Sequence, residues 1–114
     1  MCNQMVVHEL SDAEVDLIFH ALADSTRRDI VTRAIRHEQS VTALAQSYAM
    51  SFAAVQKHVA VLERAALVTK ERRGRQQIVR GNLDTIRRAS DLLDRYEQLW
   101  RERAGRIADL LGED

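Results

Sequence analysis

A predicted helix at residues 51–65 carries polar side chains on its outer face. With Val55 as the inward reference and about 100° of rotation per residue, Gln56 and Lys57 lie on the opposite face. A glutamine amide can pair with both N6 and N7 of adenine, and a lysine can reach guanine or a phosphate. His58 lies about 60° from the inward axis, which favours a half-covered structural or phosphate-contacting residue over a base reader. The pattern is typical of a helix that recognises base edges in the DNA major groove.

An arginine-rich hairpin follows this helix within a few residues. Arg72, Arg73 and Arg75 flank Gly74, and arginine at a hairpin tip suits the phosphate backbone or a narrow minor groove. Each segment alone could be an ordinary exposed helix or a charged hairpin, but the two in this order favour DNA binding. The residues that we expect to contact double-stranded DNA are Thr42, Ser51, Phe52, Ala53, Gln56, Lys57, His58, Arg72, Arg73, Arg75 and Gln77.

Hydrophobic periodicity predicts five helices and two short strands. The helices are expected at residues 12–23, 25–36, 41–48, 51–65 and 82–111, and the strands at 67–72 and 75–80 around Gly74. Asp24, Thr42 and Ser51 are the expected N-caps of the second, third and fourth helices. The expected inward residues of the second helix are Ile30, Val31, Ala34 and Ile35, and those of the fourth are Val55, Val59 and Leu62.

This order of elements predicts a winged helix-turn-helix, mainly α with a small two-stranded β-wing (α-α-α-α-β-β-α). We expect one domain over residues 1–114, with the helix-turn-helix at about 42–65, the wing at about 67–80 and a dimerisation helix at about 82–111. A short helix braced behind an exposed one is the arrangement that offers a helix to the major groove.

Charge is sorted along the chain although the net charge is zero. Residues 1–24 carry five acids and no Lys or Arg, whereas residues 57–80 carry seven Lys and Arg against two Glu. Binding of a polyanion depends on the local electrostatic field of such a basic segment rather than on the net charge.

The sequence has no apolar run of the ~20 residues that a membrane span needs, and Cys2 is the single cysteine. We therefore expect a cytoplasmic protein without a membrane partner.

The segments FHALADSTRRDIV and VTALAQSYAMSFAAVQKHVAVLERAALV resemble the ArsR/SmtB (arsenic-repressor) family of winged-helix transcriptional regulators. The resemblance covers about residues 15–80, and the ending YEQLWRERAGRIADLL is similar to members with a long terminal helix and no known metal site. It implies a winged helix-turn-helix fold and a repressor. Two departures are Ala49 and Ala66, which stand where the family commonly has Gly, and each would cost on the order of 1 kcal/mol if its backbone needs a positive φ. Phe52 is a third departure, since the family often has a polar residue there.

The sequence lacks the ligand spacing of a metal site. The predicted helix at 41–48 contains no Cys or His, and no His follows His58, although thiolate or imidazole ligands are needed for tight binding of soft or borderline ions. A site assembled across subunits from Cys2 and His8 is the alternative. No Gly-rich phosphate loop and no paired nucleophile and base form a recognisable motif, so we expect neither a metal or other cofactor nor catalytic activity.

The apolar stripes of the first and last helices predict a homodimer. Ile86, Leu93, Trp100 and Ile107 are spaced by seven, and the first predicted helix carries a similar stripe. Burying both stripes against their two-fold copies would place two recognition helices about one DNA turn apart, ~34 Å, on a near-palindromic site. The alternative is that the stripe packs on its own domain. The expected interface residues are Val15, Ile18, Phe19, Ile86, Leu93, Tyr96, Trp100 and Ile107.

Two other functions remain open at this stage. A helix-turn-helix scaffold can bind a protein partner instead of DNA, although the basic wing argues against that function. Alternatively, a DNA-binding regulator can respond to a small-molecule or protein inducer near the dimer helices, where Tyr96 and Trp100 could line a pocket.

Overall fold

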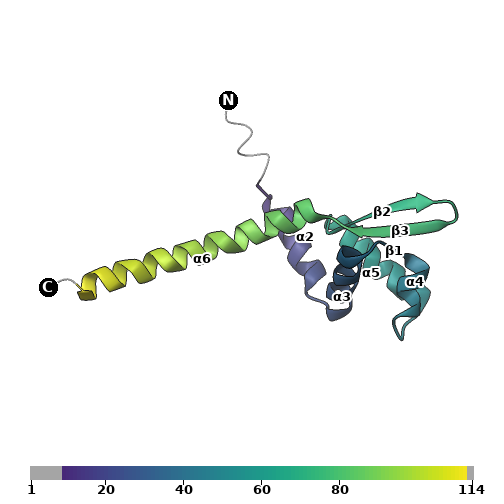
Figure 1. Ribbon diagram of the computed structural model, residues 1–114, viewed down its shortest axis with the longest axis horizontal. Coiled ribbons are helices and arrows are strands. Elements are labelled where there is room, and N and C mark those ends of the chain that lie inside the picture. The colour runs from purple at the N-terminus through teal and green to yellow at the C-terminus, as the bar shows by residue number, and fades with distance from the viewer. Residues whose placement is uncertain (1–8, 113–114) are drawn as a thin grey trace, which may run out of the picture.

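The computed structural model describes residues 9–112, which form four helices and three strands around one core and a long terminal helix (Figure 1). The elements are α2 (Asp12–Leu22), α3 (Ser25–Arg36), β1 (Gln39–Ser40), α4 (Val41–Gln46), α5 (Phe52–Arg64), β2 (Val68–Arg73), β3 (Gln76–Gly81) and α6 (Leu83–Gly112). The hairpin of β2 and β3 extends from one side of the core and α6 from the other, so the molecule measures 70 × 40 × 23 Å. No helix within residues 9–112 is both long and apolar enough to cross a membrane.

Short polar side chains determine where four of the helices begin. Ser11, Asp24, Ser40 and Ser51 each accept a hydrogen bond from the backbone N–H three residues on, at 3.1, 3.0, 3.0 and 3.1 Å. The expected caps Asp24 and Ser51 are therefore confirmed. The prediction of Thr42 as a cap is wrong, because Ser40 has the extended backbone of an N-cap and Thr42 is already inside α4.

The sheet has three strands, in the order β1-β3-β2, where the sequence predicted two. Gln39 pairs with Val79 and Ser40 with Ile78, and these two residues are too few to produce a recognisable alternation. β2 and β3 pair from Val68↔Gly81 to Arg73↔Gln76, one residue later than predicted. Gly74 and Arg75 form the two-residue loop of the hairpin. Gly74 has a φ of +64° and Arg75 has no positive φ, which is the pattern of a type II′ turn.

The core lies between α2, α3, α4, α5 and one face of the sheet. Val55, Val59 and Leu62 of α5 are completely buried, as the periodicity predicts. Ile30, Val31 and Ala34 of α3 are also buried, but Ile35 is 57% exposed and its prediction as a core residue is wrong. Ile35 lies about 140° around the helix from Ile30, at the edge of the apolar stripe, where it covers the backbone of Gly81.

A hydrogen-bonded turn at Ala66 redirects the chain from α5 into β2. The Leu67 N–H donates to the Leu62 carbonyl at 3.0 Å and the Ala66 N–H donates to the Glu63 carbonyl at 2.9 Å. These two bonds form a Schellman motif, in which the residue at the position of Ala66 is usually Gly. Ala66 has a φ of +60° and is the one non-glycine residue of the described chain with a positive φ. Of the two alanines that stand where the family commonly has Gly, Ala66 thus carries backbone strain and Ala49 does not.

A polar network attaches the turn after α4 to α3. The Tyr48 hydroxyl donates to Asp29 at 2.5 Å, Arg33 donates to the same carboxylate oxygen at 2.8 Å, and the Arg33 guanidinium lies 5.5 Å from the Tyr48 ring centroid. Desolvation and the bond to Asp29 raise the pKa of Tyr48 to about 12, and the bond from Tyr48 lowers the pKa of Asp29. The predicted helix at 41–48 ends early, at Gln46, because the next residues form a tighter turn that brings Tyr48 to this network.

Replacing Ala66 with Gly should raise the free energy of unfolding by about 0.5–1 kcal/mol, because Gly adopts this backbone conformation without steric strain. Ala49→Gly is the matched control and should give no gain, since Ala49 has an ordinary φ. Urea denaturation at one fixed protein concentration measures both, which keeps any contribution of subunit association constant. If the Ala66→Gly variant were less stable than wild type, the inference of backbone strain at Ala66 would be wrong.

Replacing Tyr48 with Phe should lower the free energy of unfolding at neutral pH by about 0.5–1 kcal/mol, a low value because the Asp29 side chain is 48% exposed. The folded-state pKa of Asp29 lies below its ordinary value, so this stabilisation is present above about pH 4 and is lost as the pH falls through the folded pKa. Denaturation curves at a series of pH values should therefore converge for wild type and Tyr48→Phe in acid. Tyr96→Phe is the control, because its hydroxyl bonds to no carboxylate within residues 9–112 and any change in stability that it causes should not vary with pH. A difference that is constant across the whole pH range would exclude Asp29 as the partner.

Candidate nucleic-acid interface

The burial of one face of α5 leaves a different set of side chains on its outer face. Val55 and Val59 are completely buried, and the side chains of Phe52, Gln56 and Lys57 are exposed. Ser51 and Ala53, at the start of the helix, are exposed as well. Five of the predicted DNA-contacting residues therefore lie together on the outer side and at the start of α5.

Thr42 and Gln77 are two predicted contact residues that lie outside α5. Thr42 is exposed, but it belongs to the first turn of α4, the helix that packs behind α5. Gln77 belongs to β3, where it is half-buried and pairs with Arg72. The predicted contact residues thus come from α4, α5 and the hairpin, which lie side by side in the fold (Figure 1).

Arg27 connects α5 to the end of α2, a contact that the sequence analysis missed. Its Nε donates to the Ala21 carbonyl at 2.7 Å and its Nη2 donates to the His20 carbonyl at 3.0 Å. Its Nη1 lies 3.3 Å from Nδ1 of His58. Because a guanidinium can only donate, Nδ1 must accept, which leaves the proton of a neutral His58 on Nε2. His58 is half-buried and has a structural partner, as its position on the helix suggested.

The hairpin has two faces with different ionic partners. Side chains alternate along β2, so Lys70 and Arg72 share one face and Glu71 and Arg73 share the other. The Lys70 ammonium lies 3.5 Å from Glu63 of α5, which identifies the face of Arg72 as the one beside α5. The Arg72 Nε also donates to the Gly74 carbonyl at 3.2 Å, which holds this side chain near the tip.

Four charged side chains form a closed ring on the other face. We call Glu38, Glu71, Arg73 and Arg80 the wing cluster. Arg73 is 2.5 Å from Glu38 and 3.4 Å from Glu71, and Arg80 is 2.7 Å from Glu71 and 3.6 Å from Glu38. The bond from Arg73 lowers the pKa of Glu38, and the bond from Arg80 lowers the pKa of Glu71, so both carboxylates are charged at neutral pH.

The three arginines at the tip are therefore not equivalent. Arg73 is engaged by two carboxylates, whereas no salt bridge within residues 9–112 involves Arg72 or Arg75. The acidic partner Glu38 lies 35 positions before Arg73 in the chain. No local pattern could have revealed that contact, because it depends on the pairing of β1 with β3.

The outer half of α6 carries an apolar face that no other element within residues 9–112 covers. Leu93, Tyr96, Trp100 and Ile107 are 51%, 59%, 63% and 45% exposed, whereas Ile86 packs against the core. On α2, Val15 is half-buried and Phe19 is 40% exposed. Ile18 is only 1% exposed because it packs into the core of its own chain, so its prediction as an interface residue is wrong.

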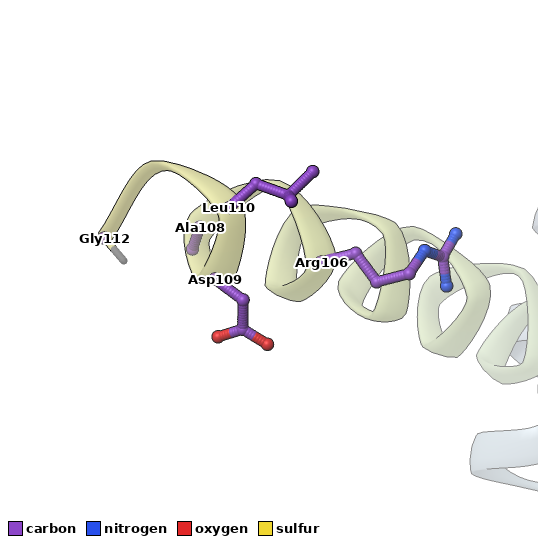
Figure 2. A pocket seen from close by; sticks show the side chains of 5 residues that line it. All are labelled: Arg106, Ala108, Asp109, Leu110 and Gly112. Atoms are coloured by element: carbon purple, nitrogen blue, oxygen red, sulfur yellow. The ribbon is translucent and has the colours of Figure 1, made fainter. Parts of the chain in front are cut away.

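Two hollows along the outer half of α6 are lined by residues of that helix alone. The one at the end of the helix is lined only by residues of α6, and its side chains point in different directions (Figure 2). A second hollow lies between Leu92, Tyr96 and Leu99 and includes no residue of another element. Trp100 and Tyr96 therefore do not enclose a cavity without a second chain.

Residues 9–112 contain no group of three or more His, Cys, Asp and Glu side chains that could hold a metal ion. The alternative metal site from Cys2 and His8 lies outside the residues that the structure describes. 

Solved structures of other proteins share this fold. An ArsR-like transcriptional regulator from Rhodococcus sp. RHA1 is 31% identical over 86% of this chain and 92% of its own, with a TM-score of 0.76. A second ArsR family transcriptional regulator is 26% identical over 82% of this chain and 96% of its own, also with a TM-score of 0.76. The homodimeric winged helix-turn-helix DNA-binding domain of a Mycobacterium bovis protein is 23% identical over 78% of this chain and 89% of its own, with a TM-score of 0.62.

No protein-family model matches the sequence, and no curated protein matches it. The first of these structures nevertheless combines 31% identity with nearly complete coverage of its chain, and the family resemblance of the sequence motifs is confirmed. The chain belongs to the ArsR family of transcriptional regulators, with the winged helix-turn-helix fold of that family.

Proposed function

We propose that this regulator is a repressor that binds a near-palindromic operator in double-stranded DNA as a homodimer. The observation that carries the proposal is the orientation of α5. Its apolar stripe is fully buried while Gln56 and Lys57 face outward, beside a hairpin whose Arg72 and Arg75 lack acidic partners among the described residues. Repression follows from the family to which the chain belongs, and a dimer that covers a promoter would act by blocking access.

In this proposal α5 enters the major groove with its N-terminal half. Gln56 pairs with adenine, Lys57 reaches guanine or a phosphate, and Phe52 or Ala53 contacts a thymine methyl. His58 donates a hydrogen bond from its Nε2 to a phosphate oxygen. Arg72 and Arg75 contact the phosphate backbone or the minor groove at the tip of the hairpin, and the half-buried Gln77 supports Arg72.

The exposed stripe of α6 supports the dimer. A helix of 30 residues is about 45 Å long, and beyond Leu93 almost no side chain is covered by its own chain. A continuous apolar face of this size is a typical interface. The Mycobacterium bovis neighbour is described as homodimeric, which favours the same assembly here. The proposed interface residues are Val15, Phe19, Ile86, Leu93, Tyr96, Trp100 and Ile107.

We propose further that the regulator acts in the cytoplasm, without catalytic activity and without a metal ion, since the helix at 41–46 contains no Cys or His and residues 9–112 hold no group of three or more possible metal ligands. The salt dependence of binding to random duplex DNA distinguishes this proposal from a protein-interaction module. Neutralisation of phosphates makes affinity fall steeply as salt rises, whereas a protein-interaction module would show no such fall.

Lys57→Ala and Arg75→Ala should each weaken binding to any duplex and reduce the slope of log affinity against log salt by roughly 0.9 per lost phosphate contact. Gln56→Ala should instead reduce discrimination between matched and mismatched operators by about 1–3 kcal/mol, with little change in affinity for random DNA. Selection of bound sites from random DNA supplies the operator, and fluorescence anisotropy over a salt series measures each variant. Equal effects of all three variants on every sequence would exclude a base-reading role for Gln56.

Trp100→Ala should shift the protein from dimer to monomer at micromolar concentration and weaken operator binding with it, because a large interface side chain is removed. Sedimentation velocity and operator titration on the same samples measure both effects. Gln98→Ala is the matched control, since residue 98 lies about 160° around α6 from Trp100. If the Trp100→Ala variant sedimented as a dimer with wild-type affinity, the interface would lie elsewhere.

A further inference from the structure

The wing cluster occupies the face of the hairpin opposite α5, and its ion pairs connect residues on or beside all three strands. Glu38 immediately precedes β1, Arg80 lies on β3, and Glu71 and Arg73 lie on β2. Since Gln39 pairs with Val79, the antiparallel register continues to Glu38 and Arg80 as neighbours. The four side chains are 41–53% exposed, so they are accessible to a large polyanion.

We propose that Glu38 and Glu71 set the DNA affinity of this regulator by holding Arg73 and Arg80 in the wing cluster and away from the phosphates. The inference rests on the proposed function, which it extends by identifying residues that limit DNA binding. It also divides the arginines of the tip into two classes. Arg72 and Arg75 contact DNA, and Arg73 is a restrained cation whose contribution appears only when its carboxylate partners are removed.

Two physical effects act in the same direction. Arg73 must give up contacts at 2.5 and 3.4 Å with two carboxylates before it can reach a phosphate. In addition, the two carboxylates add negative charge to the hairpin that approaches the DNA in the proposed complex, and like charges across an interface lower affinity. The low pKa values of Glu38 and Glu71 keep both effects present at neutral pH.

The effect should be moderate. Ion pairs at this degree of exposure are weak and screened by salt, so DNA phosphates can compete for Arg73 once one carboxylate is neutralised. Glu38→Gln preserves the size of the side chain and removes only its charge. We expect this variant to bind duplex DNA about two- to fivefold more tightly at low salt, with a salt slope steeper by roughly 0.9 per subunit. Glu71→Gln should shift affinity in the same direction.

A double-mutant cycle separates release of Arg73 from a general change in charge. In an Arg73→Ala background, Glu38→Gln should increase affinity clearly less than in the wild-type background, because only direct repulsion and the Glu38–Arg80 contact remain to be removed. Glu97→Gln is the charge control, since it removes the same charge from the Glu97–Arg101 pair of α6 at 2.7 Å. In the wild-type background, Glu97→Gln should leave affinity and salt slope unchanged. Thermal unfolding of every variant confirms that each is folded under the conditions of the titration.

The outcomes distinguish this inference from the proposed function. If wild type shows no salt-dependent binding to duplex DNA, the proposed function itself fails. If wild type binds but Glu38→Gln matches Glu97→Gln, or if the full gain persists undiminished in the Arg73→Ala background, the restraint by the wing cluster is wrong and the function stands. An NMR titration tests the cluster without DNA: Arg73→Ala should raise the pKa of Glu38 towards its ordinary value, and an unchanged pKa would overturn the inference.

Discussion

The burial of one face of α5 determines where every polar residue on its other face points. Val55, Val59 and Leu62 have no exposed surface, and truncating buried side chains of this kind costs about 2–5 kcal/mol for Leu and less for Val. Rotating α5 by one residue would expose part of this stripe and bury polar groups in its place. The outward position of Gln56 and Lys57 is therefore a consequence of core packing, and the function proposed for them depends on it.

Polar contacts between distant segments complete the orientation that core packing begins. Arg27 binds two carbonyls at the end of α2 and reaches His58 on α5, while Tyr48 and Arg33 share Asp29 and attach the turn between α4 and α5 to α3. The turn of the helix-turn-helix and the middle of α5 are thus both fastened to α3. Because the same helix also packs on β3, the recognition helix and the hairpin share one support.

Local patterns predict most of the elements and the outward face of α5, because helical periodicity and N-caps are properties of neighbouring residues. Asp24 and Ser51 illustrate this, since each caps a helix through a bond to a residue only three positions away. The wrong predictions concern residues whose burial or ion pairing depends on tertiary contacts. Ile18 and Ile35 belong to apolar stripes, yet one lies in the core and the other outside it, and the carboxylates that engage Arg73 are placed by strand pairing rather than by sequence proximity.

The short connection between β3 and α6 restricts how the core with its hairpin and the long helix α6 can change independently in evolution. β3 ends at Gly81 and α6 begins at Leu83, so Asn82 alone separates the sheet from the long helix. Inserting a single residue into the first turn of α6 would rotate the rest of the helix by about 100° and shift it by about 1.5 Å, so its apolar face would point in a new direction. Residue-by-residue substitution can change either part, but a change in length at this connection would alter the angle between the two hairpins of an assembled pair.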